Sequence, residues 1–177
     1  MPKKDRNSAA PAASLEALLE RARDFGAARA KVIPAAAVAV GEWVRWKCQF
    51  GCGCYGTRRS CPPHSPTPES TRRALACYRR AILLEGGSRP VRETVADLER
   101  EVFLAGFHQA FGMASGPCHL CKQCRLEGPC RFPERARPAM EACGVDVFAT
   151  VRAAGWELRV VRTEQETAHY FGLVLVD

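Results

Sequence analysis

The chain has 177 residues, of which 47% are hydrophobic, and a formal net charge of +7 at pH 7. This length and apolar content fit one globular domain with an ordinary core. No stretch is long and apolar enough to span a membrane, and no signal-peptide hydrophobic region follows Met1, so we expect a cytoplasmic protein. Because cytoplasmic thiols stay reduced, the ten cysteines are interpreted as metal ligands more than as disulfides.

The N-terminal part of the chain contains one predicted helix and one predicted strand. Residues 1–13 are polar, rich in Ala and Pro and without apolar periodicity, which predicts a disordered tail. Ser14 is expected to cap a helix, because the apolar residues of 15–25 keep helical spacing. Residues 28–33 predict a short strand that ends at a proline. Residues 43–46 predict an extended segment that leads into the first cysteine region.

The middle of the chain predicts a helix, a strand and a second, longer helix. Thr67 and Pro68 form a helix start, since a capping hydroxyl precedes a proline at the first helical position. The apolar run 81–84 follows as a buried strand that ends at a pair of glycines. Residues 91–110 carry a broad apolar stripe of helical period, which predicts a long helix at the centre of the core.

Two short helices and two strands are predicted in the C-terminal part. The helices cover residues 138–143 and 146–154, and a glycine stops each of them. Residues 156–161 and 170–176 alternate or run apolar, as strands do, with a turn between them. The mixed order of elements predicts an α+β fold. We expect a single domain over residues 14–177, in which helices pack on a small, mostly antiparallel sheet with two cysteine-rich metal-binding loops.

The motif that says most about function is a C-x2-C-x2-C-x5-C array formed by Cys118, Cys121, Cys124 and Cys130. A tight loop with this spacing can place four thiolates around one 4Fe–4S cluster. Structural zinc is an alternative, although zinc sites favour two separated C-x2-C pairs. Free or redox-active thiols are the remaining alternative. We predict that these four cysteines bind a 4Fe–4S cluster.

A second candidate site is formed by Cys48, Cys52, Cys54 and Cys61, with the irregular spacing C-x3-C-x1-C-x6-C. Glycines in this segment let backbone N–H groups turn toward cluster sulfurs. Cys52 and Cys54 would point to opposite sides of an extended segment, so one of them need not be a ligand. We predict a metal site here, as a second iron–sulfur cluster with an open or non-cysteine fourth position, for which His64 is a candidate. Zinc and packing thiols are the alternatives.

The two other cysteines lie outside both regions. Cys77 falls in a predicted helix, and Cys143 directly precedes a glycine that ends another. We predict that each is a small buried hydrophobic residue, not a metal ligand.

Several strings of residues carry a resemblance to a known family over roughly residues 14–177: VRWKC at 44–48, CPP at 61–63, GPCHLC at 116–121, RPAMEACGVDV at 137–147 and YFGLVLVD at 170–177. In these strings the chain resembles the predicted metal-binding proteins of domain of unknown function 2284. The resemblance implies metal binding, with iron–sulfur as the expected chemistry, and assigns no further role. It matches Cys48, Cys52, Cys61 and all four cysteines of the later array to the family's cysteines, and it leaves Cys54 as an extra.

The net charge of +7 has two interpretations. A 4Fe–4S core of about +2 held by four thiolates adds about −2, so two clusters would remove about four positive charges. We interpret the basic residues near the cysteines first as counterions of such clusters. An acidic partner or nucleic acid is the alternative.

The sequence therefore predicts a metal-binding protein with one or two 4Fe–4S clusters. It would act in electron transfer with a redox partner protein, or as an accessory in redox or cofactor metabolism. The alternatives are a zinc-stabilised binding module with a basic surface, and an enzyme that uses a cluster with an open iron site. We do not expect nucleic acid as the partner. No phosphate-binding loop, dinucleotide fingerprint or nucleophile–base pair is present.

Overall fold

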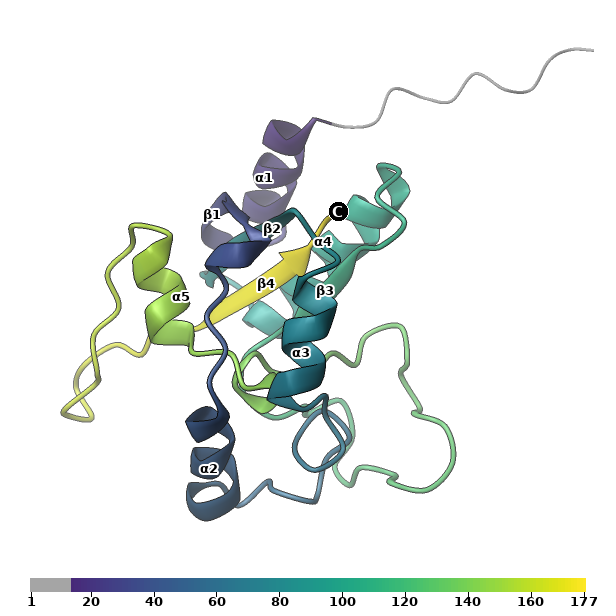
Figure 1. The fold of residues 1–177 in the computed structure, drawn as a ribbon, viewed down its shortest axis with the longest axis vertical. Helices are drawn as coiled ribbons and strands as arrows, with labels where there is room; N and C mark the ends of the chain where they lie inside the picture. The colour runs from purple at the N-terminus through teal and green to yellow at the C-terminus, as the bar shows by residue number, and fades with distance from the viewer. Residues whose placement is uncertain (1–13) are drawn as a thin grey trace, which may run out of the picture.

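The computed structural model describes residues 14–177 as a four-stranded sheet with helices on both faces (Figure 1). The tail expected at residues 1–13 lies outside the described residues. All neighbouring strands are antiparallel, in the spatial order β1 (Ala27–Pro34), β2 (Arg80–Gly86), β4 (Phe171–Leu175) and β3 (Phe111–Met113). The predicted α+β class with a small antiparallel sheet is confirmed.

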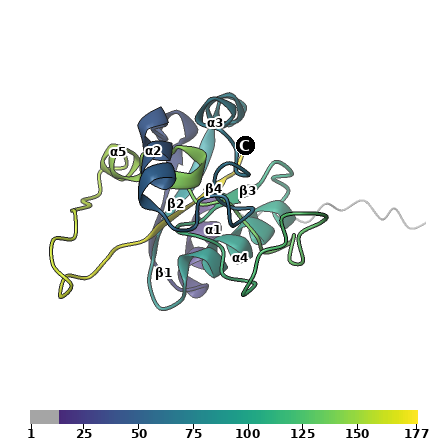
Figure 2. The same cartoon turned by 90° about the horizontal axis from the view of Figure 1, so that it is seen from below.

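One face of the sheet is covered by two helices, α1 (Leu15–Asp24) and α4 (Val91–Leu104). Ile82 and Leu84 of β2 belong to this core, together with fully buried residues of α4 such as Val95. Each such side chain contributes about 1.5–3 kcal/mol on burial. Figure 2 shows both helices on the same side of the sheet. Helix α4 is therefore fixed firmly, and its other side is free to support the cysteine loops.

The opposite face, which carries Leu83 of β2, is covered by short elements and loops. Met140 and Val145, on either side of a short 3₁₀ helix, are fully buried in this second core. The short elements of the chain are η1 (Ala35–Ala37), α2 (Glu42–Gly51), α3 (Pro68–Leu75), η2 (Glu141–Cys143) and α5 (Val147–Ala153). Helix α2 packs against η2, and this contact brings the first cysteine region to the sheet.

The predicted helix caps are confirmed, whereas the extended segment at residues 43–46 is wrong. Ser14 and Thr67 accept hydrogen bonds from the first turns of α1 and α3. Residues 43–46 belong to α2, and no strand of the sheet lies beside them. Aromatic and β-branched residues favour strands, but without a neighbouring strand this segment satisfies its backbone groups within a helix.

Three other predicted elements differ from the structure. Helix α4 ends at Leu104 instead of residue 110, because Gly106 adopts a left-handed conformation with φ of 100°. Residues 156–161 form no strand, since β4 already pairs with β2 on one edge and β3 on the other. In the predicted helix 138–143, only η2 is helical.

Candidate metal centre

The four cysteines of the later array lie on a long loop between β3 and η2, and they face one small cavity. Residues 115–138 of this loop contain no helix or strand (Figure 1). A cavity of about 20 Å³ is lined by the side of the loop that carries its thiols and by residues 58–60 of the first cysteine region. The cysteines that line it are Cys118, Cys121, Cys124 and Cys130. All four predicted ligands therefore come together at one place.

Two arginines of the first cysteine region donate hydrogen bonds to backbone carbonyl groups of this loop. Arg58 donates from Nη1 to the carbonyl oxygen of Cys121 at 2.8 Å. Arg59 donates from Nε to the carbonyl oxygen of Arg125 at 2.7 Å and from Nη2 to that of Leu126 at 2.6 Å. Hydrogen bonds from charged donors are stronger than neutral ones. The arginines thus hold the loop's shape and also place positive charge beside its thiols.

Backbone N–H groups point at two of the sulfurs. The N–H of Arg59 donates to Sγ of Cys124 at 3.5 Å, and the N–H of Phe132 donates to Sγ of Cys130 at 3.4 Å. Such hydrogen bonds stabilise a thiolate more than a thiol. Around a metal–thiolate group they also raise the reduction potential.

Helix α4 anchors both ends of the loop through one half-buried guanidinium, that of Arg92. Arg92 donates to the carbonyl oxygens of Ser115 at 3.1 Å and Gly116 at the start, and of Arg137 at 2.6 Å at the end. Burial lowers the pKa of Arg92, while Cys118 and Cys61 are among the groups that raise it. Arg92 is therefore a half-buried cation next to both cysteine regions.

Two ion pairs strengthen the exit of the loop. Arg137 donates from Nη2 to Oε1 of Glu99 at 2.7 Å, and the two side chains are only 15% and 13% exposed. Arg135 pairs with Asp97 at 2.6 Å. Because both acids lie on α4, the packed helix fixes the residues that follow Cys130.

The first cysteine region begins on α2 and closes on η2. Cys48 lies in the last turn of α2, and Cys52 is the residue after the helix ends. Burial is the largest cause that raises the pKa of the Cys48 thiol. The negative charges of Cys52, Glu141 and Cys61 raise it further. Arg45 opposes this increase. Cys48 thus has two other thiols and one carboxyl group as electrostatic neighbours.

Cys61 lies where the two cysteine regions meet. It is 7% exposed, and the Ser60 hydroxyl lies 3.9 Å from its Sγ. The same hydroxyl oxygen accepts a hydrogen bond from the Cys118 N–H at 3.2 Å. Burial raises the pKa of the Cys61 thiol, and the hydrogen bond from Ser60 lowers it. One serine therefore connects the two sets of cysteines.

The remaining candidate residues differ in how far they are exposed. Cys54 is half-buried and raises the pKa of Cys61, which puts it on that side of the first region. His64 is exposed. Cys143 is buried as predicted, but Cys77 is exposed, because it falls in the turn after α3 and its Sγ reaches only the Arg73 carbonyl.

All ten cysteines are free thiols in the structure. Between residues 14 and 177, no three Cys, His, Asp or Glu side chains are close enough to hold a single metal ion. The thiols of the later array thus share a cavity without sharing one coordination sphere. The donor set around that cavity consists of thiols alone, without imidazole or carboxylate among its lining residues.

Sequence reasoning missed the residues that join the two regions. Ser60 contacts Cys118 across 58 positions, and Arg92 contacts Arg137 across 45. No local spacing signals such contacts. Sequence reasoning also missed Glu141, which lies close enough to Cys48 to raise the pKa of its thiol.

Comparisons with known proteins agree with the cysteine pattern. No helix in the described part of the chain has the length and apolar character needed to cross a membrane. No curated protein and no solved structure matches the chain. One family profile, described as "Predicted metal-binding protein (DUF2284)", matches residues 31–176, which include both cysteine regions. This confirms the resemblance noted in the sequence, and the chain belongs to this family of predicted metal-binding proteins.

Proposed function

We propose that the protein is an iron–sulfur protein that holds a 4Fe–4S cluster on the later cysteine array and passes single electrons to or from a partner protein. The observation that carries this proposal is the common cavity of Cys118, Cys121, Cys124 and Cys130. Four thiols from one loop, lining one space with no other donor type, are the ligand set of a cubane cluster.

The distances between ligating groups favour a cluster over a single zinc ion. A tetrahedral zinc site with Zn–S bonds of about 2.3 Å brings its sulfurs to about 3.8 Å from one another. The four cysteines of the later array line one cavity. Within residues 14–177, however, no three Cys, His, Asp or Glu side chains are close enough to hold a single ion. A cluster separates its thiolates more widely, since several iron atoms lie between them.

The surroundings of the array suit a group that gains and loses one electron. A 4Fe–4S cluster with four thiolates carries about −2, and one-electron reduction makes it about −3. Arg58, Arg59 and Arg92 supply positive charge to the loop, and two N–H groups point at its sulfurs. These groups stabilise the added electron and raise the potential. A one-electron donor protein would supply that electron.

We propose a second metal site at Cys48, Cys52 and Cys61. Its support is the electrostatic proximity of the three thiols, with Cys54 beside Cys61. The family resemblance supplies only three cysteines for this site. One iron of a cluster bound here would then have a coordination position open to another ligand. Because Cys61 and Cys118 share the Ser60 hydroxyl, the two sites would lie near enough for electrons to pass between them.

The partner we propose is a redox protein with an acidic surface. Trp46 and Phe50 on α2 are 62% and 82% exposed beside the first cysteine region, where they can be buried by a partner. The net charge of +7 favours association with an acidic surface through electrostatic steering. Substitution of Phe50 by Asp should slow electron transfer to such a partner without changing the iron content.

The test is metal and sulfide analysis of protein purified without oxygen. We expect a brown protein with broad absorption near about 400 nm and about four irons with matching sulfide for one cluster, or about eight for two. Cys121→Ser and Cys124→Ser should remove the iron of the later array. Cys77→Ser is the matched control, because this exposed thiol is remote from both regions in the chain and should leave iron unchanged.

A colourless protein with stoichiometric zinc would overturn the iron–sulfur proposal. Together with oligonucleotide affinity that falls steeply with salt, it would support a zinc-stabilised module with a basic surface instead. An iron content that Cys121→Ser and Cys124→Ser leave unchanged would show that no cluster is bound by the later array.

A further inference from the structure

A second, larger cavity lies beside the first cysteine region and is not part of the thiol-lined cavity. Its volume is about 350 Å³, which lies at the lower end of the range for small-molecule sites. The walls are mostly apolar and come from α2, the start of α5, the segment before β4 and β4 itself. The apolar side chains include Val44, Val145, Val147, Phe148, Leu158 and Phe171.

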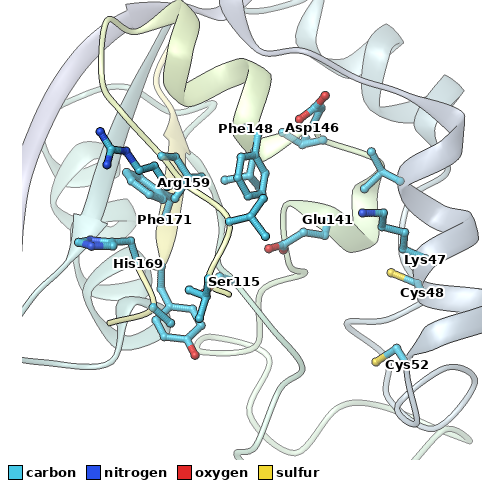
Figure 3. A pocket seen from close by; sticks show the side chains of 18 of the residues that line it. Lys47, Cys48, Cys52, Ser115, Glu141, Asp146, Phe148, Arg159, His169 and Phe171 are labelled. Carbon is cyan, nitrogen blue, oxygen red and sulfur yellow. The ribbon is translucent and has the colours of Figure 1, made fainter. Parts of the chain in front are cut away.

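One buried polar group faces this apolar space. The carboxyl group of Glu141, in η2, points into the cavity between the side chains of Ser115 and Phe148 (Figure 3). Its Oε2 atom is buried and has no hydrogen-bond partner, and no other buried side-chain nitrogen or oxygen within residues 14–177 lacks one. A buried polar atom without a partner is costly, so its retention points to a group that completes it.

Groups of the chain act on the carboxyl group of Glu141 but leave its Oε2 atom without a partner. Burial raises the pKa of Glu141, while backbone hydrogen bonds from Glu141 itself and from Gly116, and the positive charge of Arg92, lower it. The hydrogen bonds of the Arg92 side chain go to the carbonyl oxygens of Ser115, Gly116 and Arg137. Asp146, the other acid of the cavity, is occupied as the cap of α5, where it accepts from the Ala149 N–H at 2.9 Å.

The cavity also reaches the first candidate metal site. Cys48 and Cys52 line its edge, and Figure 3 shows their sulfurs on the opposite side from His169. Lys47 and Arg159 also line the cavity, as exposed residues. A molecule anchored on Glu141 would therefore have its apolar part within the walls and one edge beside the thiols.

We propose that this cavity binds a small organic molecule with an apolar body and a cationic nitrogen donor, which hydrogen-bonds to Glu141. The ligand lies against Cys48 and Cys52, two of the three cysteines proposed for the first metal site. Binding at this site goes beyond electron transfer and does not depend on it, because binding can be measured whichever metal the protein holds.

The experiment uses three probes that share one ring system: 1-naphthylmethylamine, 1-naphthylmethanol and 1-naphthylacetate. Each is titrated into the metal-loaded protein by calorimetry. We expect the amine to bind at least about tenfold more tightly than the alcohol, since a hydrogen bond between charged groups is worth more than a neutral one. The carboxylate should bind most weakly, because it is repelled by Glu141.

Two variants locate the site. Glu141→Gln keeps the shape of the side chain and should reduce the advantage of the amine over the alcohol to less than about threefold. Glu20→Gln, at an exposed glutamate of α1 on the other face of the sheet, is the matched control and should behave as wild type. Val147→Phe narrows the cavity and should weaken the amine and the alcohol alike.

The result that overturns the proposal is equally direct. No binding of the amine, or equal affinity of Glu141→Gln and wild type for it, removes Glu141 as the anchor. Tighter binding of the carboxylate than of the amine would show that Lys47 and Arg159 select the ligand instead. Unchanged binding to Val147→Phe would place the probes outside this cavity. The iron content of each variant is measured alongside, so that loss of the metal is recognised separately from loss of the anchor.

Discussion

Replacement of Arg92 by Met tests whether its half-buried guanidinium holds the long cysteine loop in place. The side chain makes hydrogen bonds to three carbonyl oxygens, those of Ser115, Gly116 and Arg137, and so ties both ends of the loop to α4. Methionine fills a similar volume but donates nothing. The carbonyl groups then lose their partner in a partly buried place.

The magnitude follows from these three bonds. A hydrogen bond from a charged donor contributes about 1.5 kcal/mol at the low end of its range, so three give about 4.5 kcal/mol. Removing a buried charge returns part of this, because the desolvation cost of the guanidinium disappears. We expect a net loss of about 2–3 kcal/mol in the free energy of unfolding. With a urea m value of about 2 kcal/mol/M, the midpoint falls by about 1–1.5 M.

The assay is urea denaturation followed by circular dichroism under reducing, oxygen-free conditions. Arg100→Met is the matched control, because this arginine lies on the same helix with a 72% exposed side chain. It should change the free energy by no more than about 0.5 kcal/mol. Arg92→Lys should fall between the two, since an ammonium group cannot span all three carbonyls. A midpoint for Arg92→Met equal to that of Arg100→Met would refute the anchoring role.

Two further predictions concern titration. Hydrogen bonding to Arg80 lowers the pKa of Asp177, so this pair stabilises the fold above the ordinary carboxyl pKa and ceases to do so as pH falls through the lowered value. The stability difference between wild type and Asp177→Asn should therefore shrink steadily below about pH 4 in acid-unfolding curves. Burial raises the pKa of Cys143 to about 12, so iodoacetamide at pH 8 should leave it unmodified while exposed Cys77 reacts, as mass spectrometry would show; equal labelling would contradict the buried position.

Local signals explain which parts of the fold could be predicted. Ser14 and Thr67 are caps whose bonds reach only three residues along the chain, so the sequence contains the whole interaction. The strand at residues 81–84 is fully buried, and its apolar run marks it as such. The α+β class followed from counting elements of this kind.

The failures concern segments whose structure depends on distant neighbours. Residues 156–161 have the composition of a strand, yet the edges of β4 are taken by β2 and β3. Trp46 and Phe50 favour a strand or the core, but α2 carries them on the surface. Whether an apolar segment pairs, buries itself or stays exposed is decided by what else competes for the same place.

The same distinction applies to the candidate site. The spacing of the later array was sufficient to group its four cysteines, and the structure places all four around one cavity. The ligand set itself stays a prediction. The groups that orient it, Ser60 and Arg92, come from distant parts of the chain and could be found only once the chain was folded.

The hydrogen bonds from Arg58 and Arg59 to the later loop would couple metal loading at the two proposed sites. The same short stretch, residues 58–61, grips the loop and carries Cys61. If both regions hold metal as proposed, a metal group that orders the loop would also order Cys61 before anything binds there. By thermodynamic reciprocity, a metal bound at Cys61 would then favour loading of the loop by the same factor. The two proposed sites would therefore fill cooperatively.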